Sequence, residues 1–349
     1  MLIAGLIGII ILVLILPLVS HRVEENLEAF LFAMGLAAVT LSHFLGPEKM
    51  WTFHLIEESL IEPIKITIAV LAAGYIFQRY RTEITKNIVR FERSLGPRVF
   101  GFTLVVALGL LSSIITAIIA ALVLVEVISA LKLDKKFETA LTIVACYAIG
   151  LGAALTPIGE PLSTIAIAKL KGEPHHANFF YLTKTIGIYI IPGIIALGII
   201  IEYFKGKETV KAKSLTEDKT ETTKDVIIRA VKVYLFVMAL VLLGTGFKPV
   251  IDMYIVNLPA AALYWINMIS AILDNATITA AEISPQMTDY QIRFLLMGLL
   301  ISGGMLIPGN IPNIIAAGKL KIKSREWAKL GVPLGLALML IYFIVFEIL

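Results

Sequence analysis

Eight runs of apolar residues, each long enough to cross a bilayer as a helix, constrain this chain more than any other feature of its sequence. A transmembrane helix needs about 20 mostly apolar residues. The runs cover 2–20, 27–45, 60–78, 138–172, 178–203, 226–246, 290–322 and 329–348. The alternating pattern of a membrane β-barrel is absent from the sequence. The sequence therefore predicts an all-α polytopic membrane protein with about eight transmembrane helices.

The composition agrees with this class. Hydrophobic residues make up 58% of the 349 positions and charged residues 16%, against about 45–50% and about 25% in soluble domains. This much apolar surface does not fit one aqueous core, which excludes a soluble enzyme, a nucleic-acid-binding protein and a secreted disulfide scaffold. We expect membrane lipid as a partner and no nucleic acid.

Two further apolar stretches, 99–131 and 259–286, are too long for one span, and small polar residues interrupt both. We interpret each as a re-entrant hairpin that enters and leaves on the same side. Most of the 30 Lys and Arg residues then fall on one side, as the positive-inside rule requires of the cytoplasmic side. This topology predicts a multi-pass protein of the cell membrane with the N-terminus and the C-terminus outside, and a basic amphipathic helix over 79–98 on the cytoplasmic face.

The chain contains an internal repeat, because residues 156–171 resemble residues 307–321. Aligning the two Lys-Leu-Lys triplets pairs Gly159 with Gly309, Glu160 with Asn310 and Ser163 with Asn313. Each half has the order helix, hairpin, broken helix, helix, in opposite orientations. The domains we expect are N-terminal transmembrane helices in 1–46, a first inverted repeat in 60–203 (hairpin 99–131, broken helix 138–172), a cytoplasmic linker in 204–224 and a second inverted repeat in 225–349 (hairpin 259–286, broken helix 290–322).

Inverted repeats with helices broken by glycine and proline are typical of secondary transporters. Unwound backbone survives at membrane depth only where it lines a polar cavity. We expect the breaks to be lined by Thr156, Gly159, Ser163, Thr164, Gly303, Gly304, Asn310 and Asn313. The predicted tip of the first hairpin consists of Ser112, Ser113 and Thr116.

Two acidic residues in these interrupted segments are the main candidates for an ion site. An ionisable residue at the bilayer centre costs about 2.5–3.5 kcal/mol, which makes it a functional hypothesis. Asp274 stands next to Asn275, Thr277 and Thr279, and such an oxygen-rich group suits a hard cation, here Na⁺. Glu160, in the first break, is the second ion-binding or proton-carrying candidate.

Other polar residues are interpreted as structural. Glu126 is expected to pair with Lys132, and Glu282 to face water at the outer side. His175 and His176 are expected in a solvated loop, because a transition-metal site there lacks a third ligand. We expect no catalytic residues, no transition-metal site and no cofactor.

These segments resemble the ion transporter superfamily. The stretch 269–280 is similar to the Ser-x-x-x-Asp-Asn hairpin motif of NhaD-type sodium/proton antiporters, and 152–164 is similar to their Gly-Gly-x-x-Ser-Pro-x-Gly-Asp segment, with Glu160 in place of aspartate. Residues 302–310 resemble the glycine-rich break of the second half. The whole chain also looks like a small archaeal group that is named for cation transport and whose function is uncharacterised. The resemblance covers roughly residues 100–325.

One departure from the NhaD pattern bears on mechanism. NhaD-type antiporters carry an acidic motif in the first hairpin too, where this chain has Ser112, Ser113 and Thr116. Asp274 then acts alone or with Glu160 as the second acid. Carboxylate symporters of the superfamily use Ser-Asn-Thr hairpin tips, and the Asn310–Asn313 break is closer to their style.

The leading functional hypothesis is therefore a sodium/proton antiporter with alternating access. One intramembrane carboxylate would bind either Na⁺ (or Li⁺) or H⁺. The alternative is a sodium-coupled symporter of a small anion such as a di- or tricarboxylate, with neutral oxyacids as a weaker third substrate class. Small-residue helix faces and the relatives in the superfamily are compatible with a homodimer. A purely structural subunit would leave the breaks and Asp274 unexplained, and no nucleophile–base pair indicates an enzyme.

Overall fold

A computed structural model describes residues 2–20, 22–23, 26–46, 48–131, 133–204, 223–254, 259–273 and 275–348. These residues form helices and connecting loops, and no strand occurs among them. Together with the apolar character of the helices, this confirms the prediction of an all-α polytopic membrane protein.

The two halves of the chain have the same order of elements. The N-terminal helices are α1 (Leu2–Val19) and α3 (Leu27–Leu45). The first half then contains the long helix α4 (Phe53–Leu95), a hairpin of α5 (Pro97–Ile115) and α6 (Ala117–Ala130), a broken helix of α7 (Lys135–Ala153) and α8 (Pro161–Lys169), and α9 (Tyr181–Tyr203). The second half contains α10 (Thr223–Tyr254), a hairpin of α11 (Ala260–Ile266), the 3₁₀ helix η1 (Asn267–Ala271) and α12 (Asn275–Glu282), a broken helix of α13 (Asp289–Ser302), η2 (Ile307–Gly309) and α14 (Ile311–Leu320), and α15 (Ser324–Ile348).

Five helices within the described residues are long and apolar enough to cross a membrane. They are Glu28–Leu45, Lys135–Ala153, Tyr181–Tyr203, Val226–Val250 and Ser324–Ile348. The sequence had suggested about eight spans. Part of the difference lies in the run 290–322, because its break leaves α13 with 14 residues and α14 with 10, each too short to span alone. The expected span 60–78 and most of the expected surface helix 79–98 belong to one continuous helix, α4, which ends at Leu95.

The breaks occur where the sequence disfavours a continuous helix. Glu160 precedes Pro161, which pushes a residue towards an extended backbone, and its φ and ψ are −157° and 160°. Asn310, its partner in the repeat, has nearly the same values, −155° and 146°. The first hairpin breaks at Thr116, whose φ of 76° is unfavourable for a β-branched residue.

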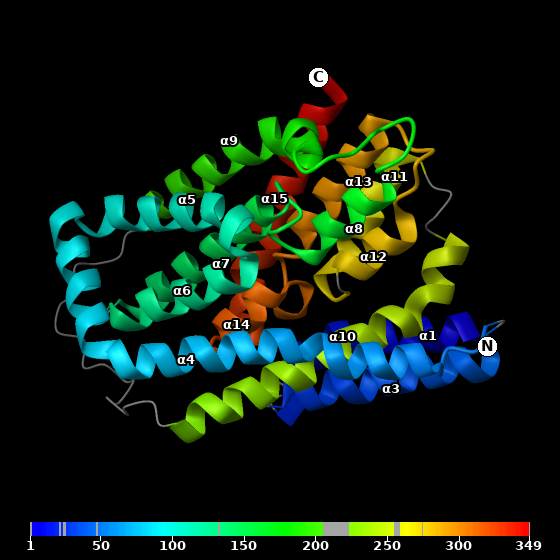
Figure 1. Ribbon diagram of the computed structural model, residues 1–349, viewed down its shortest axis with the longest axis horizontal. Helices are drawn as coiled ribbons and strands as arrows, with labels where there is room; N and C mark the ends of the chain where they lie inside the picture. The colour runs from blue at the N-terminus through cyan, green and yellow to red at the C-terminus, as the bar shows by residue number, and fades with distance from the viewer. Residues whose placement is uncertain are drawn as a thin grey trace.

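The helices form two groups (Figure 1). Helices α1, α3, α4 and α10 lie side by side along the lower edge of the view, and α10 packs on both α3 and α4. The hairpins and broken helices lie beside this group. Within them the halves interlock, because α14 of the second half packs on α6 of the first hairpin, and α8 of the first half packs on α12 of the second hairpin.

Candidate functional site

The four interruptions of the two halves meet at one small cavity of about 40 Å³. A volume of about 10–15 Å³ on this measure accommodates one water molecule, so the cavity has room for a few waters or a small ion. The residues that line it come from the first hairpin, the first break, the second hairpin and the second break: Ala117, Ile118, Gly159, Glu160, Pro161, Leu162, Asn275, Ala276, Gly309, Asn310, Ile311 and Pro312.

Four helices begin at this cavity. They are α6, α8, α12 and α14, and each places its first residues in the lining. A helix N-terminus carries about half a positive charge, because its first N–H groups have no partner within the helix. The four termini together therefore balance the charge of about two carboxylates.

Glu160 supplies a carboxyl group to this lining. Its side chain is 8% exposed, and its position directly before α8 makes it the N-terminal flanking residue of that helix. Asn310 holds the equivalent place before α14, and its Nδ2 lies close to Gly150 of α7. The repeat thus has an acid in the first half at the position where the second half has an amide.

Asn275 supplies a donor from the second hairpin. Its side chain is 5% exposed, and its Oδ1 accepts a hydrogen bond from Ser270 Oγ. Its Nδ2 has no hydrogen-bond partner among the described residues. Leaving a buried N–H without an acceptor costs about 1–3 kcal/mol, so this amide is suited to an acceptor that enters the cavity.

Gly309 allows three backbone carbonyl groups to approach the second break. A Cβ at this position would lie 2.5 Å from Gly303 O, 2.8 Å from Ser270 O and 3.0 Å from Ala271 O. Any side chain here would displace the hairpin or the break, so the close approach requires glycine. Carbonyl oxygens at such a point are ligands of the type that Na⁺ shares with other hard cations.

Matching hydrogen bonds hold the two breaks. Ser163 Oγ donates to Ala153 O at 3.4 Å, and Asn313 Nδ2 donates to Gly303 O at 2.8 Å. The hairpins show the same correspondence, because Ser112 Oγ donates to Ile149 O at 3.0 Å and Ser270 Oγ to Leu299 O at 3.2 Å. The acceptors in each pair are equivalent positions of the repeat.

Several predicted site residues lie beside the cavity and not in its lining. Thr156 Oγ1 donates to Ser113 O at 2.5 Å, Ser113 Oγ to Leu110 O at 2.7 Å and Thr279 Oγ1 to Asn275 O at 2.8 Å. These hydroxyl groups stabilise the breaks. Other predicted site residues also lie outside the lining. Thr116 caps α6, Thr164 is exposed, and Gly304 packs on the Tyr147 ring. Gly303 lies against the Asn275 amide.

Asp274 and the side chain of Thr277 lie outside the described residues. Their assignment as ion-binding groups stays a prediction. Asn275, the next residue in the chain after Asp274, lines the cavity.

The apolar part of the lining was not predicted. Ala117, Ala276 and Ile311 have side chains without polar atoms, so residue type gives no signal. They are nevertheless the first or second residue of a helix that follows a break, and this position in the repeat is the signal that could have identified them.

Two interpretations of polar residues outside the cavity were wrong, those of Glu282 and of the His175 side chain. The expected partner of Glu126, Lys132, lies outside the described residues, so that pairing stays a prediction. Glu126 Oε1 pairs with Lys319 Nζ at 3.3 Å, because α14 packs on α6. Glu282 is 2% exposed and does not face water. The His175 side chain is buried, with Nδ1 3.2 Å from Asp289 Oδ1, since the loop after α8 folds against α13.

The expectation of no transition-metal site stays a prediction. No group of three or more His, Cys, Asp and Glu side chains that could hold a metal ion occurs within the described part of the chain.

The fold and the central breaks define the class of the chain, an all-α polytopic membrane protein with a small cavity between two interlocked halves. Residues 3–349 match the family described as "Protein of unknown function (DUF1646)", and the chain belongs to this family. No curated protein matches it.

Proposed function

We propose that this protein is a secondary active transporter and that the central cavity binds the transported ion. The observation that carries the proposal is the meeting of four helix breaks, one buried carboxyl group and an unused amide donor at a single cavity. Interrupted helices that meet at mid-depth are where secondary transporters bind their ions.

Within this class we favour sodium/proton antiport. A cavity of about 40 Å³ suits a monovalent cation with few remaining waters. Glu160, together with Asp274 from the adjoining hairpin, would bind Na⁺ or Li⁺ when ionised and H⁺ when neutral. Na⁺ and H⁺ would then cross in opposite directions as the cavity opens to each side in turn.

The four helix N-termini also favour a second candidate, sodium-coupled uptake of a small anion. Helix N-termini bind anions through their free N–H groups. A di- or tricarboxylate is larger than the cavity, so this function requires the halves to separate further. We rank it second for that reason.

The test is ion exchange in proteoliposomes that contain a pH-sensitive dye. We expect added Na⁺ or Li⁺ to move protons in the wild type, and Glu160→Gln and Asp274→Asn each to abolish that movement, because both remove a group that exchanges the two ions. Glu347→Gln is the matched control, since Glu347 lies in the last turn of α15 and contacts the Tyr290 hydroxyl at 3.3 Å. Exchange that persists in both carboxyl variants would refute antiport at this cavity, and sodium-dependent uptake of a labelled carboxylate without proton movement would favour the symporter.

A further inference from the structure

A second buried carboxyl group lies within the second hairpin, outside the central cavity. Glu282 ends α12 and is 2% exposed. Its Oε2 accepts a hydrogen bond of 2.9 Å from Asn267 Nδ2, in the first arm of the same hairpin. Asn267 is fully buried. Neither residue lines the cavity.

This acid–amide pair has two oxygens without a donor. Glu282 Oε1 and Asn267 Oδ1 are both buried, and neither has a hydrogen-bond partner among the described residues. If Glu282 is ionised, its Oε1 is a buried charged oxygen without a donor. A proton on Oε1 removes that need for a donor, and a neutral acid avoids the large cost of an unpaired charge in an apolar interior.

Charged groups on the neighbouring helices have other contacts. Lys169 of α8 donates to Ile283 O at 3.3 Å, and on α10 Lys232 and Lys248 pair with Glu28 and Glu48. On α13, Asp289 contacts His175 and Tyr181, and Arg293 donates to the Tyr189 hydroxyl. Within the described part of the chain, no basic side chain forms an ion pair with Glu282.

The first hairpin shows that the fold does not require this polar pair. Matching Ser112 to Ser270, as their hydrogen bonds indicate, places Gly109 at the position of Asn267 and Leu124 at the position of Glu282. Leu124 is fully buried. The first hairpin therefore has a buried leucine where the second has a buried acid, and burial of this position alone does not explain the acid.

Helix geometry connects the pair with the cavity. Asn275, Thr279 and Glu282 are spaced by four and three residues, so they share one face of α12, and all three are buried. Glu282 lies about 10 Å along the axis from Asn275, at 1.5 Å per residue. The face is a row of polar side chains from the cavity to the buried acid.

We propose that Glu282 is a proton-carrying site separate from the cavity, held by Asn267 and connected to the cavity along the polar face of α12. The inference rests on the proposed ion transport. In this arrangement Glu282 keeps its proton while burial excludes water from the carboxyl group. It releases the proton when the hairpin arms separate and water reaches the pair.

The direct test is infrared difference spectroscopy of the full-length protein in detergent during a pH titration. We expect the C=O band of protonated carboxyl groups to lose one component in Glu282→Gln and to keep it in Glu160→Gln. In Asn267→Leu that component should shift in frequency, because its hydrogen bond is lost. An unchanged band in Glu282→Gln across the titration would overturn the proposal.

Transport gives the second readout. In Glu282→Gln we expect sodium-driven proton movement to fall about a hundredfold, the lower end of what a positioned proton carrier contributes, with sodium binding by calorimetry unchanged. If Glu282→Gln does not fold, the double variant Asn267→Gly with Glu282→Leu reproduces the apolar pair of the first hairpin and takes its place. Wild-type rates in that variant would overturn the proposal. If the wild type moves no protons in response to sodium, the proposed antiport fails, and the infrared band still decides whether Glu282 holds a proton.

Discussion

At the residue scale, the second break requires a residue without a side chain at Gly304. A Cβ here would overlap the ring of Tyr147, and that ring is fixed because its hydroxyl donates to Gly331 O at 2.6 Å. The indole of Trp327 donates to the Gly304 carbonyl at 3.1 Å. The Tyr147 ring and the Trp327 indole therefore enclose the break, and their hydrogen bonds hold both side chains in place.

Gly304→Ala should destabilise the protein by about 1–3 kcal/mol, the usual effect of overpacking a buried site. Thermal unfolding in detergent measures it as a lower Tm. Gly318→Ala is the matched control, because a Cβ at Gly318 in α14 meets no atom within 4 Å, and alanine there should leave the Tm unchanged or raise it. Equal Tm values for Gly304→Ala and the wild type would contradict the packing around the second break.

Asn275→Ala should reduce transport while lowering the stability of the protein only slightly. Ser270 keeps its bond to Leu299 O at 3.2 Å when the Asn275 acceptor is removed, so the loss in stability should stay near 1 kcal/mol. The cavity would lose its unused donor, and sodium/proton exchange should fall with it. Unfolding and exchange measured on one preparation test this, and full exchange in a stable variant would be the opposite result.

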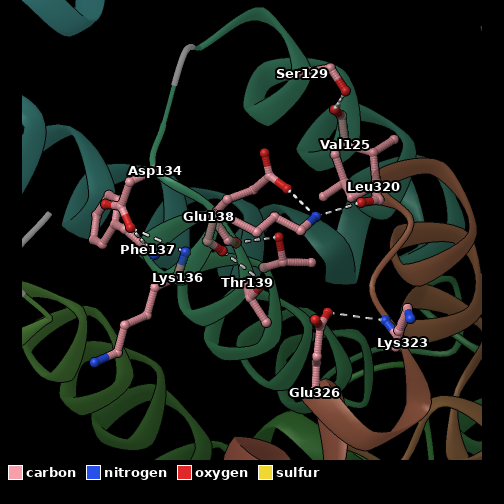
Figure 2. Close-up of polar contacts among 12 residues, drawn as sticks. Val125, Ser129, Asp134, Lys136, Phe137, Glu138, Thr139, Leu320, Lys323 and Glu326 are labelled. Atoms are coloured by element: carbon pink, nitrogen blue, oxygen red, sulfur yellow. Dashed lines mark hydrogen bonds and ion pairs between the residues drawn. The ribbon is translucent and has the colours of Figure 1, made fainter. Parts of the chain in front are cut away.

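At the scale of elements, the contact of α6 with α14 includes an ion pair. The side chains of Glu126 and Lys319 are each 12% exposed, with Oε1 and Nζ 3.3 Å apart. Nearby, Lys135 Nζ at the start of α7 donates to Glu138 Oε1 at 2.7 Å and to Leu320 O at the end of α14 at 2.8 Å (Figure 2). These contacts tie the second break to the first half.

Removal of one member of this pair should cost more than removal of both. Glu126→Gln or Lys319→Met alone leaves a mostly buried charge without this ion pair, and such a change in a buried pair costs up to about 3–5 kcal/mol. The double variant leaves no such charge and should recover part of the stability. A double-mutant cycle by chemical unfolding measures the coupling, and additive losses would show that the pair contributes nothing as a unit.

The sequence predicts the helices well where the hydrophobic periodicity and the positions of proline and glycine indicate the same boundaries. Pro161 and the aligned lysines locate both breaks. The range 259–286 encloses α11 and α12, and the range 99–131 contains α6 and all but the first two residues of α5. The partners of buried charges were not predictable, because Glu126 meets Lys319 only through the packing of one half on the other. Likewise, Glu282 is buried on a helix that packs on α8 and α10, and no local pattern distinguishes that from an exposed helix end.

At the scale of the whole molecule, each half completes the other. Helix α8 packs on the second hairpin and α14 on the first, and all four breaks meet at the cavity. The cavity therefore does not exist within either half alone.

Fragments 1–204 and 205–349 should accordingly associate when they are produced together. A tag on one fragment should co-purify the other from detergent extract, because their interlocked helices bury apolar surface and the Glu126–Lys319 pair. Each fragment produced alone should aggregate on size-exclusion chromatography. Two fragments that are separately monodisperse and do not associate would argue against the interlocked arrangement.

The exchange of packing partners between the halves also has a consequence for biosynthesis. Glu126 leaves the ribosome about 190 residues before Lys319, which corresponds to about 10 to 40 s of translation at 5–20 residues per second. During that interval α6 lies in the membrane before the lysine of α14 has been made. The ion pair between the two halves therefore forms only when most of the chain has been synthesised.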